Sequence, residues 1–188
     1  MDEPKYEWDW WLKQWNQALI ERLDPDEYQY YEPTVIQAVH SNWLGNLGAT
    51  QEQILSLEQR LKIHLPPSYR QFLIASNGFQ QPGMLVPRLY RVEDVEWFRV
   101  RNQGTIDAWL NYGMPPVEEV KEADPDYFVQ FFPFMLEISA KEASGSTRYL
   151  LNPKRVREDG EWEAYYYANV RLETTLLFEL RTTGTSAV

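Results

Sequence analysis

The feature that most constrains the fold of this chain is that two hydrophobic periodicities occupy separate parts of it. Up to Gly78, apolar side chains recur every three or four residues, which is the spacing of one helix face. Beyond Gly83 the pattern changes to short apolar runs that alternate with polar residues, as in strands. Helices that precede strands, instead of alternating with them, favour an α+β protein. We therefore expect N-terminal helices packed against a mainly antiparallel sheet of the meander type.

The first expected helix, over residues 4–23, carries many of the aromatic side chains. Its apolar stripe, at helical spacing, consists of Trp8, Trp11, Leu12, Trp15, Leu19 and Leu23. An apolar stripe of this kind has to be covered by another surface. The docking face predicted within it is Trp8, Trp11, Trp15 and Leu19. This face packs either on the rest of the domain or on a second copy of the chain, which would form a homo-oligomer.

Three further helices are expected before Gly78. One runs from Pro33 to Leu44. The next begins at Thr50, because a hydroxyl followed three residues later by Gln53 has the form of a capping box. The string Leu65-Pro66-Pro67 ends that helix and starts the last one, because proline is accepted in the first turn of a helix and not in its interior.

Beyond Gly83 the sequence predicts short strands within residues 85–92 and, after them, one short helix and three strands of a meander. These three strands cover residues 134–138, 149–151 and 162–168, and the helix covers residues 107–112. Asp159-Gly160, between the last two strands, is a hairpin signal, because glycine takes the positive φ that tight turns require.

Composition divides the 188 residues into three predicted parts. Residues 1–32 form a Trp-rich helical extension with an acidic linker, and residues 33–181 form the α+β domain. Residues 182–188 are small and polar and are expected to form a flexible tail. The chain has no cysteine, which excludes disulfides and thiolate metal sites.

The charge of the chain limits its partners. Its 28 acidic and 18 basic residues give a net charge of −10. Nucleic acids and anionic membranes bind basic surfaces, so both are disfavoured. Residues 1–48 and residues 92–133 each carry nine acidic and three basic residues. These two segments predict either a solubilising surface or the steering of a basic protein partner.

The location expected for this protein is the cytoplasm. No stretch of the sequence has the roughly 18 consecutive apolar residues that a transmembrane helix needs. The first residues are acidic, whereas a secretory signal begins with a basic region followed by an apolar one.

The candidate catalytic and metal-binding residues have simpler structural interpretations. His40 and His64 lack the spacing of a zinc site. Glu161 and Glu163 form a carboxylate pair of the kind that glycoside hydrolases use. Strand alternation nevertheless places this pair near arginines, as cross-strand ion pairs on a solvated face. We expect no cofactor, no metal site and no catalytic residues.

Residues 49–79 carry a recognisable string of motifs. They read Ile54-x-x-Leu57-Glu58-x-x-Leu61, then Leu65-Pro66-Pro67-x-Tyr69-Arg70-x-Phe72-Leu73, then Asn77-Gly78. The string resembles the SUKH superfamily, which includes fungal regulators of cell-wall assembly and many bacterial immunity proteins. The strand pair of that family is similar to Leu150-Leu151-Asn152-Pro153 and Asp159-Gly160-Glu161-Trp162-Glu163. The resemblance covers residues 43–180, and it departs from the family pattern at residues 169–173, which lack a Pro-Gly.

The resemblance implies an α+β domain that binds proteins and is not an enzyme. We expect an immunity-type protein that binds and neutralises a cognate toxin, with a basic toxin domain as its partner. A regulatory scaffold module of the cell-wall-assembly type is the alternative, and a carbohydrate-active enzyme is a third reading. The residues expected to contact the partner are Glu93, Glu96, Glu118, Glu119, Glu122, Asp124 and Asp126.

Overall fold

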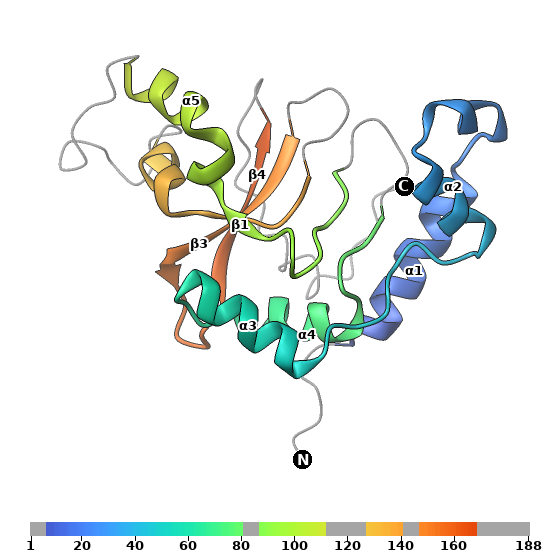
Figure 1. Ribbon diagram of the computed structural model, residues 1–188, viewed down its shortest axis with the longest axis horizontal. Coiled ribbons are helices and arrows are strands. Elements are labelled where there is room, and N and C mark those ends of the chain that lie inside the picture. Colours follow the sequence, from blue (N-terminus) through green and yellow to red (C-terminus); the bar gives the residue numbers. More distant parts are fainter. Residues whose placement is uncertain (1–6, 81–86, 112–126, 141–146, 169–188) are drawn as a thin grey trace.

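The computed structural model describes residues 7–80, 87–111, 127–140 and 147–168 (Figure 1). Its first part contains α1 (Trp8–Glu21), the 3-10 helix η1 (Pro25–Tyr30), α2 (Pro33–His40), α3 (Gln51–Leu61) and α4 (Pro67–Ala75). Its second part contains β1 (Glu96–Trp97), α5 (Phe98–Asn111), the 3-10 helix η3 (Tyr127–Phe134), β2 (Leu136–Glu137), β3 (Thr147–Val156) and β4 (Trp162–Ala168). The predicted tail, residues 182–188, lies outside the described residues.

The strands pair in chain order, β1-β2-β3-β4, and each is antiparallel to the next. Leu136 of β2 lies opposite Leu151 of β3, which lies opposite Ala164 of β4. The turn between β3 and β4 holds Gly160 at a φ of +82°, as the Asp159-Gly160 signal predicts. The expected α+β class and the meander order of the sheet are therefore confirmed.

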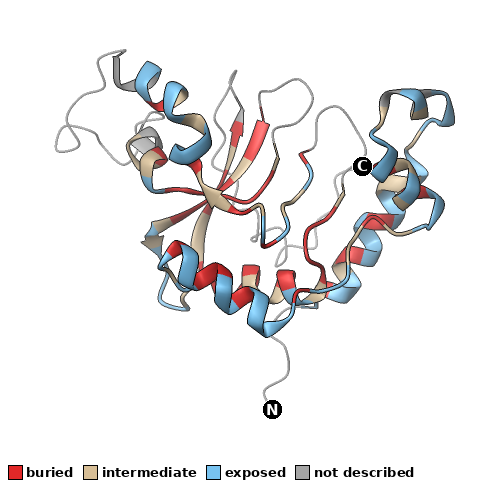
Figure 2. Cartoon of the chain, viewed as in Figure 1, coloured by how far each residue is buried: buried red, intermediate tan, exposed pale blue. Residues whose placement is uncertain are grey.

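Helices cover both faces of the sheet. Leu136, Leu151 and Ala164 face the cluster that α1, α3 and α4 form with the sheet. The neighbouring residues point the other way, since side chains alternate along a strand. Leu150 and Tyr165 accordingly pack with residues of α5 and η3 in a second cluster. Figure 1 shows α3 and α4 on one side of the strands and α5 on another, and Figure 2 colours part of α3 and of α4 as buried and part as exposed.

The two-sided cover corrects one sequence expectation. The alternation of residues 134–138 predicts one buried and one solvated strand face. In the structure Met135 and Glu137 are as buried as Leu136 and Ile138, while Phe134 is exposed. Alternation identifies a strand that has one wet face, whereas this short strand is covered from both sides.

In the motif string that covers α3 and α4, Glu58 stabilises the fold. This buried carboxylate accepts a hydrogen bond from the backbone N–H of Leu65 at 3.0 Å and forms an ion pair with Arg70 at 3.1 Å. It therefore fixes the turn between the two helices. The predicted capping box at the start of α3 is also present, with Thr50 and Gln53 each bonding the backbone of the other.

Gly78 closes this region for two reasons. Its φ is +83°, and a Cβ atom on it would lie 2.9 Å from the carbonyl oxygen of Leu89. A residue with a side chain would be strained there in its backbone and would collide with the neighbouring chain.

Two helix boundaries differ from those expected. α2 ends at His40 and not at Leu44, because Asn42 takes a left-handed conformation with φ +57° and turns the chain. α5 begins at Phe98, well before residue 107, and bends at Asn102, whose φ of −128° is not helical. The early start was missed because the first turn of α5 mixes exposed charged residues with buried Phe98 and shows no clear stripe.

The described part of the chain contains no helix of the length and apolar character needed to cross a bilayer.

Candidate interaction site

The residues predicted to contact a partner fall into two groups. Glu93 lies in the turn that leads into β1, Glu96 is the first residue of β1, and both are described. Glu118, Glu119, Glu122, Asp124 and Asp126 lie outside the described residues.

Arg60, on the last turn of α3, holds this turn in place. Its Nη1 forms an ion pair with Glu96 Oε2 at 3.0 Å. Its Nη2 donates hydrogen bonds to the carbonyl oxygens of Val92 and Val95, at 3.2 and 2.7 Å. The guanidinium is therefore occupied by the chain's own groups, and Glu96 is an internal ion-pair partner.

Glu93 is placed differently, on the wall of a groove. A cavity of about 380 Å³ lies between α3 and the turn before β1. It is lined by Thr50, Glu52, Gln53, Ser56, Leu57, Arg60, Val92 and Glu93. We call this cavity the α3 groove. The buried side chains of Leu57 and Val92 form its apolar floor, and exposed polar side chains surround them.

The start of α3 positions the rim of the groove. The capping box orients the first turn, which carries Glu52, and an acid there is favoured by the positive end of the helix. Gln53 Nε2 lies 3.5 Å from Glu93 Oε1 and spans the groove. Because Arg60 is neutralised by Glu96, the charge presented at the rim is that of two carboxylates. The α3 groove suits a positively charged group more than a negative one.

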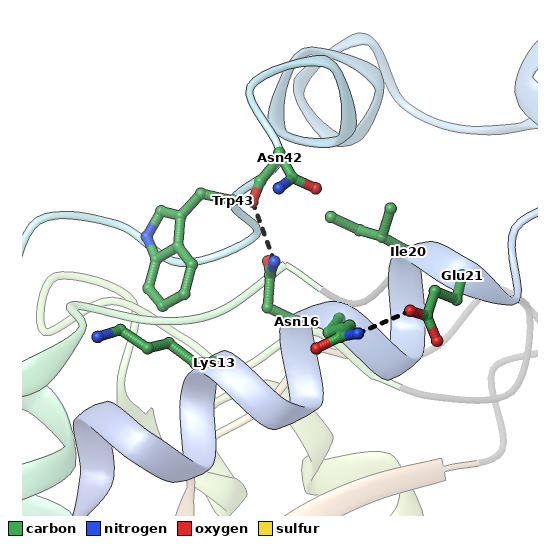
Figure 3. Close-up of a pocket in the computed structure, with 7 residues that line it drawn as sticks. Lys13, Asn16, Ile20, Glu21, Asn42 and Trp43 are labelled. Carbon is green, nitrogen blue, oxygen red and sulfur yellow. Dashed lines mark hydrogen bonds between the residues drawn. The ribbon is translucent and has the colours of Figure 1, made fainter.

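A second cavity, of about 470 Å³, lies between α1 and the turn at Asn42 and Trp43 (Figure 3). Asn16 of α1 uses both ends of its amide here. Its Nδ2 donates to the Asn42 carbonyl at 3.0 Å, and its Oδ1 accepts from the Leu44 N–H at 2.8 Å. The side chains of opposite charge along this cavity are Lys13 and Glu21. Because their charges balance, the cavity indicates no charge for a ligand.

The residues of the predicted docking face lie at different depths. Trp8 is 5% exposed; its Nε1 donates to the carbonyl of Ser68 at 2.9 Å, and its ring meets Phe72 edge-on. Trp11 and Leu19 are half-buried against the same cluster. Trp15 is exposed at the edge of the face, 6.3 Å from Trp8 between ring centroids.

Asn16 is a buried member of this helix face that sequence reasoning missed. Stripe analysis selects apolar residues, so a polar residue at the same helical spacing is assigned to solvent. Its position four residues after Leu12 was the available signal.

Glu161, at the β3–β4 turn, does not lie on the solvated face that was expected for it. Glu161 is buried and accepts hydrogen bonds from Ser68, at 2.9 Å from the backbone N–H and 2.6 Å from Oγ. Glu163 accepts a hydrogen bond from the hydroxyl of Tyr165. Burial, together with this carboxylate, raises the pKa of Tyr165. Glu161 thus stabilises the fold, which counts against a glycosidase pair.

The histidines are apart and exposed. His40 lies beside the ring of Tyr28, with 6.4 Å between ring centroids, and His64 follows the end of α3. Within residues 7–80, 87–111, 127–140 and 147–168, no three His, Asp or Glu side chains gather to hold a metal ion.

A buried charge cluster joins β2, β3 and α5 on the face of the sheet that α5 covers. Glu137 of β2 is 2% exposed and forms ion pairs with Arg148 of β3 at 2.9 Å and Arg101 of α5 at 3.4 Å. Asn102, at the bend of α5, donates to the same carboxylate at 3.2 Å. Burial raises the pKa of Glu137, and the two guanidinium groups oppose that rise. The cluster ties α5 to the sheet.

Comparison with known families matches most of this chain. The model of the SMI1/KNR4 family (SUKH-1) matches residues 48–180. The matched region contains the whole α3 groove, whereas α1 and α2 precede it. Comparisons with curated proteins and with solved structures gave no match.

Proposed function

Because this chain belongs to the SMI1/KNR4 family (SUKH-1), we propose that it works by binding another protein, as an immunity-type protein that neutralises a cognate toxin. The resemblance to the SUKH superfamily is confirmed by the match over residues 48–180. The family is generally non-catalytic, which supports binding as the activity.

One observation of this chain carries the proposal further: its family domain presents an open groove whose acidic side chains form no ion pair with any Lys or Arg among the described residues. The groove is the α3 groove, with Glu52 and Glu93 at its rim. A net charge of −10 adds a long-range field of the same sign. Both favour a basic partner, and such fields act mainly on the rate of association.

The first experiment is purification of the tagged full-length protein from its native host, with mass spectrometry of the proteins that elute with it. One stoichiometric partner that carries a toxin domain is the expected result. The family match equally supports a regulatory scaffold, which would instead bring down several partners in substoichiometric amounts. The absence of any protein partner would contradict both.

The second experiment tests whether acidic side chains of this protein increase the rate at which a basic partner associates. Glu118→Lys with Glu119→Lys should lower the association rate of the purified partner about tenfold at low salt, with a smaller effect at 0.15 M salt. The control, Glu32→Lys with Glu158→Lys, makes the same change in net charge at two exposed positions elsewhere. Equal association rates for the two variants would mean that net charge alone matters and that the segment 118–126 is no contact.

A further inference from the structure

The α3 groove has a construction suited to one long side chain. Its floor is apolar, since Leu57 and Val92 are buried in the core beneath it. Its walls are the exposed face of α3 and the turn that carries Glu93. The hydroxyls of Thr50 and Ser56 complete the lining.

The charges at the groove leave a position for a cation that the described residues do not supply. No Lys or Arg among the described residues forms an ion pair with Glu52 or Glu93. Arg60 is the nearest candidate, and its two terminal nitrogens are already bound to Glu96 and to backbone carbonyls. A cation from outside would therefore meet two carboxylates, of which Glu93 already accepts a hydrogen bond from Gln53, without displacing an ion pair of the described residues.

The combination of an apolar floor and a carboxylate rim selects the chemistry of the guest. Arginine has an apolar stem that packs on hydrophobic surface while its charged head stays near water. Its planar guanidinium has donors enough for two carboxylates at once and is weakly hydrated, unlike the ammonium of lysine. A neutral guest would leave both carboxylates without a cation.

From these features we infer that the α3 groove receives an arginine side chain of the partner protein, with its stem on Leu57 and Val92 and its guanidinium between Glu52 and Glu93. This inference rests on the proposed function, because it names the partner's contact at the site through which binding is proposed. It makes the groove a specificity pocket, in contrast to the diffuse attraction that the rest of the acidic surface provides.

The test is a titration of the isotope-labelled full-length protein, followed by NMR, with a blocked tripeptide that has arginine at its centre. Saturable shifts are expected in the backbone amides at the start of α3 and at Glu93. The same peptide with citrulline, which is neutral and of nearly the same shape, should give none. Glu52→Gln with Glu93→Gln should weaken binding about tenfold, which corresponds to about 1.4 kcal/mol for two partly exposed ion pairs. The matched control, Glu32→Gln with Glu158→Gln, should bind as the parent does.

Several outcomes would overturn the inference. Equal shifts with citrulline would show that no charge is recognised, and equal affinity for a lysine peptide would remove the preference for a guanidinium. Unchanged binding by Glu52→Gln with Glu93→Gln would place the peptide elsewhere. Both substitutions lie at exposed positions and keep the side-chain shape, so a folded variant is expected, and its amide spectrum reports this directly.

The two proposals fail in different ways. If a toxin partner binds the Glu52→Gln, Glu93→Gln variant as tightly as the parent, the groove is not its contact and the proposed function stands. If the arginine peptide binds the groove and no protein co-purifies from the host, the groove recognises arginine and the proposed function is wrong.

Discussion

At the scale of single residues, the least expected contact joins the β3–β4 turn to the start of α4. Pro66 occupies the N-cap position of α4 and has no side-chain acceptor, and Pro67 follows it. The free N–H of Ser68 is instead satisfied by Glu161, which comes 93 residues later in the chain. A carboxylate at this position also meets the positive end of the helix.

Glu161→Ala should therefore destabilise the protein by about 2–3 kcal/mol, because it leaves a buried N–H and a buried hydroxyl without their acceptor. Glu161→Gln keeps one acceptor oxygen and should cost about half as much. Unfolding in urea measures both changes. Glu158→Ala, at an exposed position of the same turn, is the control and should alter stability by less than about 0.5 kcal/mol. A loss for Glu161→Ala as small as that of the control would mean that the cap contributes nothing.

Short sequence patterns were sufficient to predict helix starts and tight turns. Thr50 and Gln53 identified the start of α3, and Asp159-Gly160 identified the β3–β4 turn, because both signals depend on contacts within a few residues. The partners of Glu161 and Asn16 could not be predicted from sequence, because they lie 93 and 28 residues away. The same reasoning applies to the candidate site. Glu93 was predicted from charge, but only the packing of the turn on α3 brings Glu52 beside it.

At the scale of elements, the Glu137 cluster decides how α5 meets the sheet. The carboxylate and Arg148 are both buried, and the latter also packs over the rings of Phe98 and Tyr167. Removing a charge from water is costly, and the attraction between the partners returns only part of that cost. The raised pKa of Glu137 has the same origin, since burial outweighs the two guanidinium groups.

Because burial outweighs the attraction between the charges, removing one charge should cost more stability than removing both. Arg148→Met should destabilise the protein by about 3 kcal/mol at pH 7, because it leaves a buried carboxylate without its main partner. Glu137→Leu combined with Arg148→Met should recover most of that loss, since neither charge then has to be buried. Thermal and urea unfolding of both variants and of the parent measure the difference. If the double variant is no more stable than Arg148→Met, the attraction between Glu137 and Arg148 fully compensates for the cost of removing both charges from water.

The pH dependence has a definite sign. A folded-state pKa above the ordinary value of 4.5 means that the folded protein binds this proton more tightly than the unfolded chain does. The contribution of Glu137 to stability is then full below that value and declines as pH rises through the raised pKa. Glu137→Gln removes the titration, so its stability should fall less than that of the parent over this range. Parallel pH profiles for the parent and Glu137→Gln would contradict the raised pKa.

At the scale of the whole molecule, α1 is part of the core although it precedes the region that the family match covers. Trp8 and Leu12 belong to the same buried cluster as α3, α4 and one face of the sheet. A division of the chain between residues 32 and 33 stays a prediction, and the helix on its N-terminal side shares its packing with the domain.

Two tryptophans of this helix provide a matched comparison. Trp8→Ala should destabilise the protein by about 3–5 kcal/mol, because it empties a buried site and removes the hydrogen bond to Ser68. Trp10→Ala, at a site that is 51% exposed, should change stability by less than about 0.5 kcal/mol.

Deletion of residues 1–24 should expose the surface beneath Trp8 and Leu12. Increased binding of a hydrophobic dye and a change in oligomeric state would report this exposure. A truncated protein as stable and as monodisperse as the parent would contradict this role for α1.

The way α1 is attached has a consequence for how two copies of the chain can meet. Its anchoring contacts, Trp8 on α4 and Asn16 at the turn after α2, are made with residues beyond the segment 22–32. A second molecule that supplied its own α1 would offer the same side chains to the same sites, which is the arrangement that domain swapping requires. A swapped dimer would keep every contact described here between α1 and the core and would alter only the path of residues 22–32. Its population would depend on protein concentration and on the strain in that segment, and not on any new interface.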